Sequence, residues 1–344
     1  MKTIKVDLRS DTVCKPTAEM LEAMMKAEVG DDVFGDDPTI ILLQDKIAEM
    51  FGMEAALFCT SGTMTNQIAI RVHCQPGDEV ICDKLSHIYL YEGGGIAVNA
   101  FSSVKLIDGN KGRINAEQVK ESINNKNDIH NPYSKLVSIE NSMNKGGGSI
   151  YDFNEIKKIK QVCVENNLKL HLDGARLFNA LTETIETPKD YGKIFDTISI
   201  CLSKGLGCPV GSLLLGTKEV ISKAKRFRKV MGGGWRQAGY LAAAGIYALE
   251  NNIKRLKEDH KRAKAIGEIL SKKKFVKEVY PIETNIVIFE LPDTILALDF
   301  VAKMQEYDIL CVPFGKHLVR FVTHLDFTDM HLEYFKSCMN TFDI

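Results

Sequence analysis

Several patterns that mark common classes of protein are missing from this sequence of 344 residues. The 44 lysines and arginines nearly balance the 45 aspartates and glutamates, so a net charge of −1 leaves no basic excess for nucleic acid or an anionic membrane. No apolar run reaches the roughly 18 residues of a membrane span, and the N-terminus has no long apolar segment of a signal peptide. These absences favour a soluble globular protein.

Short motifs for metals and dinucleotides are also missing. The nine cysteines contain no CxxC pair, so we expect reduced thiols in a cytoplasmic protein rather than a zinc ribbon or a disulfide framework. No G-x-G-x-x-G follows a strand with a later acidic partner, which disfavours a nicotinamide-dependent dehydrogenase. Pairs such as His171-x-Asp173 and His324-x-Asp326 are too small to be metal sites, because two ligands on one strand do not complete a coordination shell. We therefore predict no metal.

A lysine and an aspartate, each placed directly after an apolar run, carry the most information. Lys204 stands among small residues after the run 197–202, and Asp173 begins an Asp-Gly-Ala-Arg segment after the run 169–172. Open α/β sheets hold their ligands at the carboxyl ends of their strands, so we expect the two side chains to share one crevice. An amine and a carboxylate there suit pyridoxal 5'-phosphate, whose aldehyde forms a Schiff base with the lysine while the aspartate keeps the pyridine nitrogen protonated.

Taken singly, each residue has an ordinary alternative. A lysine after a strand is usually a solvated surface residue, and an Asp-Gly pair is usually a turn. The glycines beside Lys204 favour a site that backbone approaches closely.

A phosphate site is predicted at residues 61–63. Residues 55–60 form a buried-strand pattern, and Ser61-Gly62-Thr63 then open a helical pattern that runs to His73. The first N–H groups of a helix point outward and favour an anion. Ser203 could add a hydroxyl to the same phosphate. The alternative is an ordinary serine N-cap.

Helical and strand patterns alternate along most of the chain, which predicts an α/β fold with a mostly parallel sheet and helices on both faces. We expect helices at 17–28, 38–51, 62–73, 115–125, 152–166 and 217–231. Further strands are expected at 79–83, 103–107, 135–140, 169–172, 197–202 and 211–215. A long helical pattern at 237–270 forms the connector. Beyond it, strands at 285–291, 309–313 and 318–323 with helices at 295–307 and 328–340 predict an α+β unit.

With these motifs in place, the chain resembles the low-specificity L-threonine aldolases, which are pyridoxal-phosphate enzymes of fold type I in the aspartate aminotransferase superfamily. The resemblance runs almost from end to end. The matching segments are 7–13, 30–39, 61–64, 171–176, 201–207, 228–237 and 320–326.

This resemblance implies a large domain, 1–250, with a mostly parallel seven-stranded sheet flanked by helices. A small α+β domain, 251–344, follows it, and an N-terminal segment, 1–15, contributes to the active site.

The resemblance also assigns residues to the cofactor. It implies that Lys204 holds pyridoxal phosphate, that Asp173 pairs with the pyridine nitrogen, and that Arg176 lies near the ring hydroxyl. The phosphate would be bound by Gly62, Thr63 and Ser203. His87 matches a histidine that stacks on the ring, although a histidine at such a position alone is more often a satisfied surface imidazole.

Further residues are implied for the substrate and for a neighbouring subunit. Ser10 and Arg320, with Arg176 nearby, match the groups that hold the substrate carboxylate, for which the planar fork of arginine is suited. His130 matches a histidine near the substrate β-hydroxyl, and His87 and His130 both stay open as the catalytic base. Lys229 and Arg236 match residues that reach the phosphate of a neighbouring subunit, which implies a homo-oligomer, a dimer or a tetramer. Their alternative is a basic helix end before a glycine-rich turn.

The implied reaction is aldol cleavage of L-threonine or L-allo-threonine to glycine and acetaldehyde. A β-eliminating lyase or an aminotransferase of the same fold would use the same lysine and aspartate, so both stay as alternatives. A pyridoxal-phosphate-sensing regulator would carry an added DNA-binding domain, for which we expect no room because the resemblance begins at Asp7. The segment 140–144 reads Glu-Asn-Ser-Met-Asn where relatives more often have Thr-His after Glu-Asn, which leaves the preferred substrate open.

Overall fold

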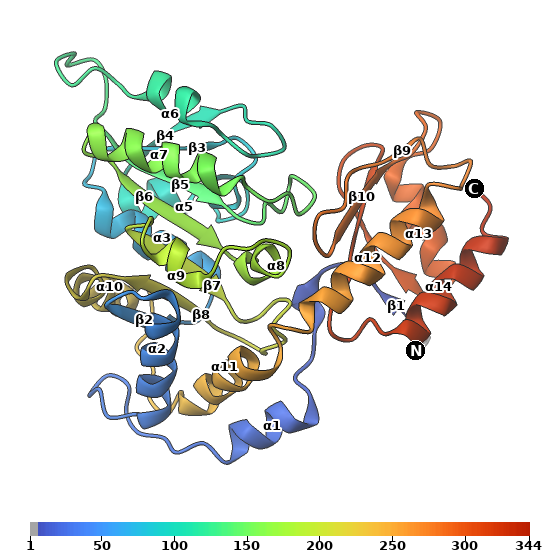
Figure 1. Cartoon of the computed structure of the whole chain (residues 1–344), viewed down its shortest axis with the longest axis horizontal. Coiled ribbons are helices and arrows are strands. Elements are labelled where there is room, and N and C mark those ends of the chain that lie inside the picture. The colour runs from blue at the N-terminus through green and yellow to red at the C-terminus, as the bar shows by residue number, and fades with distance from the viewer. Residues whose placement is uncertain (1–5) are drawn as a thin grey trace.

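The computed structural model describes residues 6–344, in which a seven-stranded sheet forms the centre of the larger of two parts (Figure 1). In β2 (Ala55–Cys59), Ala56 and Phe58 pack into the core on one face, and Leu57 and Cys59 pack into the core on the other. Successive side chains of a strand point to opposite faces, so a sheet with this pattern must be covered by helices on both. The other strands are β3 (Glu79–Asp83), β4 (Ser103–Ile107), β5 (Ser134–Glu140), β6 (Lys169–Gly174), β7 (Thr197–Cys201) and β8 (Ser212–Gly216).

The strand order is β2-β8-β7-β6-β5-β3-β4, and β8 alone among these strands runs antiparallel to its neighbours. The prediction of a mostly parallel seven-stranded sheet is confirmed. Because β5, β6 and β7 are parallel, their carboxyl ends lie at one edge of the sheet. Their register pairs Glu140 with Asp173 and Asp173 with Ser199. The fold therefore places two acidic residues side by side where a ligand is expected.

The long helices of this part begin and end at ordinary signals. Asp37 caps α2 with its side chain, Pro38 is the first helical residue, and Gly52 ends the helix with φ of 63°. The predicted helices here are α1 (Ala18–Met25), α2 (Pro38–Phe51), α3 (Gly62–His73), α6 (Ala116–Ser122), α7 (Phe153–Glu165) and α10 (Lys218–Val230).

Four further helices were not predicted because each has six residues or fewer, too few to show a period. They are α4 (His87–Leu90), α5 (Gly95–Ala100), α8 (Leu177–Leu181) and α9 (Pro188–Gly192).

The second part has its own core, which is rich in phenylalanine. Phe289, Phe300, Phe321 and Phe335 are fully buried and their rings contact one another. An antiparallel sheet of order β12-β13-β10-β9 carries this core, together with a parallel pair, β1 and β11. The strands are β1 (Val6–Asp7), β9 (Glu278–Val279), β10 (Ile286–Glu290), β11 (Ile309–Leu310), β12 (Val312–Pro313) and β13 (Leu318–Val322). The helices are α12 (Leu256–Leu270), α13 (Ala297–Glu306) and α14 (Asp329–Thr341).

The helical stretch expected at 237–270 is two helices, α11 (Gly239–Asn251) and α12, separated by a turn. Residues of α11 such as Ala242 and Leu249 pack into the core of the large part, whereas Ala263 and Leu270 of α12 pack into the second core. One straight helix could not present its apolar stripe to both cores. The break therefore lies where the chain passes from one core to the other.

The N-terminal segment departs from the expected division at residue 250. Val6 and Leu8 are buried in the core of the second part, and β1 pairs with β11 there. The segment then crosses to the large part through a short 3-10 helix, Asp11–Val13. Residues 1–5 of the expected N-terminal segment lie outside the described residues. Within residues 6–344, no helix combines the length and the apolar character needed to cross a membrane.

We predict that Leu8→Ala lowers the free energy of unfolding by about 2–5 kcal/mol, because it removes a buried side chain and leaves a cavity. Leu8 is 0% exposed, whereas Leu298 on α13 is 67% exposed. Leu298→Ala, the matched control, should change the free energy by less than about 0.5 kcal/mol. Urea denaturation followed by circular dichroism measures both. Equal effects of the two substitutions would contradict the packing of the N-terminal segment.

Candidate active site

Two adjoining cavities open at the carboxyl ends of the parallel strands. An inner cavity of about 180 Å³ and an outer one of about 340 Å³ share Lys204 and His87 in their walls. The inner cavity is lined by Ser61, Gly62, Thr63, Asn66, His87, Asp173, Ala175, Cys201, Ser203 and Lys204. The outer one is lined by Ser10, Thr12, His87, Tyr91, Asn144, Arg176, Lys204, Val312, Pro313, Phe314 and Arg320. Most of the residues predicted from the sequence therefore meet here.

Lys204 lies in a tight loop between β7 and β8. Its carbonyl accepts a hydrogen bond of 2.8 Å from the N–H of Gly207, which has φ of 79°. A Cβ on Gly205 would lie 3.0 Å from Leu256, so the loop has little room for a side chain there. No ion pair to Lys204 occurs among the described residues, and its amine is available to a ligand.

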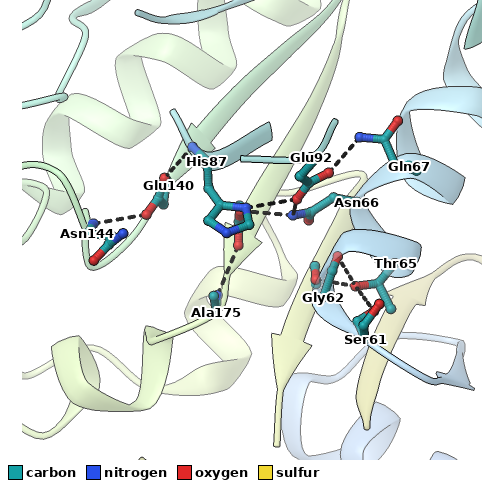
Figure 2. Close-up of polar contacts among 12 residues, drawn as sticks. Ser61, Gly62, Thr65, Asn66, Gln67, His87, Glu92, Glu140, Asn144 and Ala175 are labelled. Carbon is teal, nitrogen blue, oxygen red and sulfur yellow. Dashed lines mark hydrogen bonds and ion pairs between the residues drawn. The ribbon is translucent and has the colours of Figure 1, made fainter. Parts of the chain in front are cut away.

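Asp173 is held by donors on both of its carboxylate oxygens. The amide of Asn66 donates to Oδ2 at 2.9 Å, and the N–H of Ala175 donates to Oδ1 at 3.1 Å. Figure 2 labels both donors. The residue is 2% exposed. Its orientation is fixed by β6 and α3 before any ligand binds.

Two further buried acids, Glu92 and Glu140, surround His87 and Asp173. Glu140 accepts N–H groups from His87 and Asn144, each at 2.9 Å. Burial, reinforced by the charge of Asp173, raises the pKa of Glu140 to about 7. His87, Glu92 and Asp173 are close enough to hold a cation, but the amide nitrogen of Asn66 already donates to both Glu92 and Asp173. The carboxylates of this wall suit a cationic ligand.

His87 begins α4 and faces both cavities. Its Nδ1 lies 3.0 Å from Oε1 of Glu92. Burial by itself lowers the pKa of His87, but the contact with Glu92 and the charges of Asp173 and Glu140 outweigh it and raise the pKa overall. The imidazole is therefore tied to the acidic wall through one nitrogen.

The N-terminus of α3 forms the other end of the inner cavity. Ser61 caps the helix by accepting the N–H of Met64, which leaves the first N–H groups, those of Gly62 and Thr63, directed at the cavity. A Cβ on Gly62 would lie 2.5 Å from Sγ of Cys201, so only glycine lets the helix approach β7 this closely. This arrangement can bind a phosphate.

A buried ion pair joins Arg176, which lines the outer cavity, to Asp11 of the N-terminal segment. Arg176 donates to Asp11 through Nε at 2.7 Å and through Nη2 at 2.6 Å. Burial alone would raise the pKa of Asp11, but the charge and hydrogen bonds of Arg176, with the charge of Lys204, lower it overall. Nε and Nη2 of Arg176 are thus both engaged by Asp11, which fixes the position of the guanidinium.

Arg320 reaches the outer cavity from β13. Its Nη1 donates to Oδ1 of Asn144 at 2.9 Å, and its Nη2 donates to the carbonyl of Arg9 at 3.0 Å. Burial, with the charge of Arg176, lowers its pKa to about 10. No acid pairs with this guanidinium within the part of the chain that the structure describes, so it is free to take a carboxylate beside Ser10.

The structure does not bring His130, Lys229 or Arg236 to these cavities. His130 lies in the loop before β5, with its side chain 86% exposed and bonded to Asp128. Lys229 lies in the last turn of α10, and Arg236 pairs with Asp31 on the surface. The roles of all three residues stay predictions. Those that the resemblance implies for Lys229 and Arg236 require a neighbouring chain.

Sequence reasoning missed several residues of the site. Asn66 is one polar residue inside a helical pattern, and Glu92 precedes a run of glycines. Asp11 and Asn144 lie in the segments 7–13 and 140–144, whose sequences drew attention without indicating a role for either residue. The sequence of α3 does not single out Asn66, because the helix buries a continuous run in which Thr65 and Gln67 are polar as well. Met143, which stands where relatives more often have histidine, is buried against Gly112 and does not line the outer cavity. The next residue, Asn144, does line it.

Comparisons with known proteins agree on one family. The beta-eliminating lyase family matches residues 7–293. The low specificity L-threonine aldolase of Escherichia coli (strain K12) is 44% identical over 323 residues, which cover 93% of this chain and 94% of that protein. The probable low-specificity L-threonine aldolase 2 of Arabidopsis thaliana is 39% identical over 339 residues, which cover 97% of this chain and 96% of that protein.

A solved structure supports the fold. The threonine aldolase of Leishmania major superposes with a TM-score of 0.84 at 21% identity and covers 98% of this chain and 99% of its own.

We predict that Glu92→Gln lowers the pKa of His87, because the substitution removes the charge and the acceptor that raise it. In the wild type, this contact stabilises the fold below the ordinary histidine pKa of about 6.5, and the contribution disappears as the pH rises through the raised value. Titration of the His87 ring by NMR measures the change. Glu258→Gln, on the exposed face of α12, is the control and should leave His87 unchanged. A His87 pKa that is the same in Glu92→Gln would contradict the electrostatic argument.

Proposed function

Because this chain belongs to the low-specificity L-threonine aldolase family within the beta-eliminating lyases, we propose that it cleaves the Cα–Cβ bond of L-threonine and L-allo-threonine to glycine and acetaldehyde. Such an enzyme is a carbon–carbon lyase that depends on pyridoxal phosphate. The observation that carries the proposal is the inner cavity. It places a lysine, a buried aspartate and the N-terminus of a helix around one space.

The donors and acceptors of the inner cavity fit pyridoxal phosphate. Lys204 would bind the aldehyde, and the acidic wall around Asp173 would face the ring nitrogen. Gly62, Thr63 and Ser203 would hold the phosphate at the start of α3, where no side chain fits on Gly62. When bound, the cofactor supplies an electron sink for a bond that breaks at Cα.

The outer cavity is suited to hold the amino acid. Arg320 and Ser10 would bind the substrate carboxylate, since the guanidinium has no acidic partner there. Fixing the carboxylate determines which Cα bond stands perpendicular to the ring plane and therefore which bond breaks. Arg176 would lie at the boundary between the two cavities, held in place by Asp11.

His87 is the better placed of the two histidines considered as the catalytic base. It lines both cavities, and Glu92 on Nδ1 would balance the charge that His87 gains when its other nitrogen takes the β-hydroxyl proton. A positioned base typically contributes ~10²–10⁴-fold to the rate. His130 stays open as a candidate base, although its side chain is exposed and does not line either cavity.

We propose a homo-oligomer, a dimer or a tetramer, in which each active site takes Lys229 and Arg236 from a neighbouring chain. Both residues lie at the surface in the single chain. Phe34, 80% exposed, and Val230, 85% exposed, lie nearby and supply apolar surface for the contact. We also propose a cytoplasmic location, since all nine cysteines are free thiols.

We predict that the purified protein converts L-threonine to equimolar glycine and acetaldehyde, and that Lys204→Ala abolishes both the turnover and the visible absorbance of the bound cofactor. The lysine amine is the group that the aldehyde needs. Product analysis with both threonine diastereomers and an absorbance spectrum measure this. Lys223→Ala, an exposed lysine on α10, is the control and should behave as the wild type.

Two outcomes would overturn the proposal. A 2-oxo acid in place of acetaldehyde would indicate transamination or β-elimination. Turnover that is retained in Lys204→Ala would refute the assignment of the lysine.

We predict that two inactive variants restore each other's activity when co-expressed, if the active site is shared. In a hybrid of Lys204→Ala with the double variant Lys229→Ala/Arg236→Ala, one site keeps the intact lysine of one chain and the intact basic residues of the other. Random pairing in a two-fold symmetric dimer gives about a quarter of the wild-type activity. Co-expression of two differently tagged Lys204→Ala chains is the control and should stay inactive. A hybrid that is inactive, or a double variant that is fully active by itself, would contradict a shared site.

A further inference from the structure

Two histidines that the proposed chemistry does not use lie behind Asp173. His171, on β6, is fully buried, and His73, at the end of α3, is half-buried. Both hydrogen-bond to the hydroxyl of Thr197 on β7, His171 through Nδ1 at 2.9 Å and His73 through Nε2 at 3.1 Å. They belong to a continuous line of contacts that ends at the active site.

That line continues from His171 to Asp173 through Asn66. Nε2 of His171 lies 3.1 Å from Oδ1 of Asn66. The amide nitrogen of Asn66 is 2.9 Å from Oδ2 of Asp173 and 2.8 Å from Oε1 of Glu92. One amide thus bridges a carboxylate of β6 and a carboxylate of the segment between α4 and α5, and Figure 2 shows its contact with Glu92.

The chemistry of these groups fixes the direction of each hydrogen bond. Ionised carboxylates only accept, so the side of Asn66 that faces them must be its NH₂ group, and its oxygen must face His171. An oxygen accepts, so Nε2 of His171 must carry a proton. Burial lowers the pKa of both His171 and His73 to about 4, so each ring is neutral and has one donor and one acceptor nitrogen.

The remaining bonds follow from those two. With its proton on Nε2, His171 accepts through Nδ1, and the hydroxyl of Thr197 is the donor. The same hydroxyl then accepts from Nε2 of His73. Every proton in the line points toward Asp173.

We propose that Asn66 is a positioning residue for Asp173, and that His171 holds the Asn66 amide in the orientation that presents N–H groups to Asp173 and Glu92. This inference rests on the proposed function, in which Asp173 meets the ring nitrogen of pyridoxal phosphate. A reversed amide would place its oxygen against two carboxylates, and a donor on the opposite side of the amide is a second means of excluding it. The neutral Nε2–H of His171 supplies that means from behind.

The effect on the cofactor depends on the lone pairs of Asp173 that remain without a donor. Its oxygens receive one N–H each, from Asn66 and Ala175, and the carboxylate keeps lone pairs for a ligand in the inner cavity. Without the amide, Asp173 and Glu92 would be two buried carboxylates with no donor between them. A buried carboxylate that loses one of its donors is less firmly held, and Asp173 would keep only the N–H of Ala175, so its lone pairs would be presented to the ligand less precisely.

The first experiment compares Asn66→Ala with Gln67→Ala. Gln67 is the neighbouring residue on α3, is equally buried, and donates to Glu92 at 2.5 Å without contacting Asp173. We expect Asn66→Ala to raise the dissociation constant of pyridoxal phosphate by on the order of tenfold or more, and to change how the absorbance of the bound cofactor depends on pH. Gln67→Ala should change the constant by less than about threefold.

Equal losses in the two variants would overturn the proposal, since they would show a general effect on α3. An Asn66→Ala protein with wild-type affinity and the wild-type spectrum would overturn it as well. Thermal unfolding of both variants shows whether the fold is kept.

The second experiment reads the protons directly. Nitrogen-15 NMR of the histidine rings in the full-length protein, with and without added pyridoxal phosphate, should show His171 as the neutral Nε2–H form. Thr197→Val removes the hydroxyl with little change in volume. His171 should then no longer be only in the Nε2–H form but should be a mixture of the Nε2–H and Nδ1–H forms. A wild-type His171 that carries its proton on Nδ1, or that is charged, would overturn the direction of the line even if every substitution failed to fold.

These measurements separate the inference from the proposed function. Failure to release acetaldehyde would refute the aldolase, whereas the ring protons of His171 report on the line of hydrogen bonds whatever the reaction is.

Discussion

Two carboxylates that lie next to each other at the ends of neighbouring strands constrain the whole site. Asp173 and Glu140 are in register on β6 and β5, and both are almost fully buried. Like charges in such a place are tolerated only where donors and cations surround them. The protein supplies backbone N–H groups from Ala175 and Asn144, the amide of Asn66, and the imidazole of His87. The arrangement of β5, β6, α3 and α4 is therefore the arrangement that keeps these acids satisfied, and it leaves a negative wall for a cationic ring.

The site also depends on contact between two separate cores. Lys204 and Asp173 come from the large sheet, whereas Arg320 comes from β13 of the second core, and the N-terminal segment that carries Ser10 begins in that core. Arg320 joins the two by donating to Asn144 across the boundary. In the proposed function, cofactor binding would depend on the large part alone, and carboxylate binding would depend on the boundary between the two parts. A change in the relative position of the two parts would therefore affect the affinity for the substrate more than the affinity for the cofactor.

Sequence patterns located the strand ends but not what surrounds them. Lys204 and Asp173 stood out because each follows an apolar run and has glycine beside it, and both features are local. Asn66 and Glu92 gave no signal, because a polar residue in a helix or before a glycine run is common. Their importance arises from a contact between α3 and the segment before α5, which no spacing in the chain encodes. The prediction of one long helix at 237–270 was wrong for a related reason. The break between α11 and α12 is imposed by the two cores rather than by a local stop signal.

The surface around Lys229 shows how separate stretches of the chain can become one unit. The segments 30–39 and 228–237 each resemble the aldolase family, and nothing in the sequence joins them. In the structure, Arg228 pairs with Asp32 at 2.5 Å and Arg236 pairs with Asp31 at 2.8 Å. Asp32, Arg228 and Lys229 line a hollow of about 370 Å³. Ordinary surface cations gain little from fixed positions, because solvent screens them. The side chains of Arg228 and Asp32 are only 7% and 8% exposed, so that pair is largely shielded from solvent. Together with the more exposed Arg236–Asp31 pair, it holds the acidic loop against the segment 228–236, where the proposed neighbouring chain would lie.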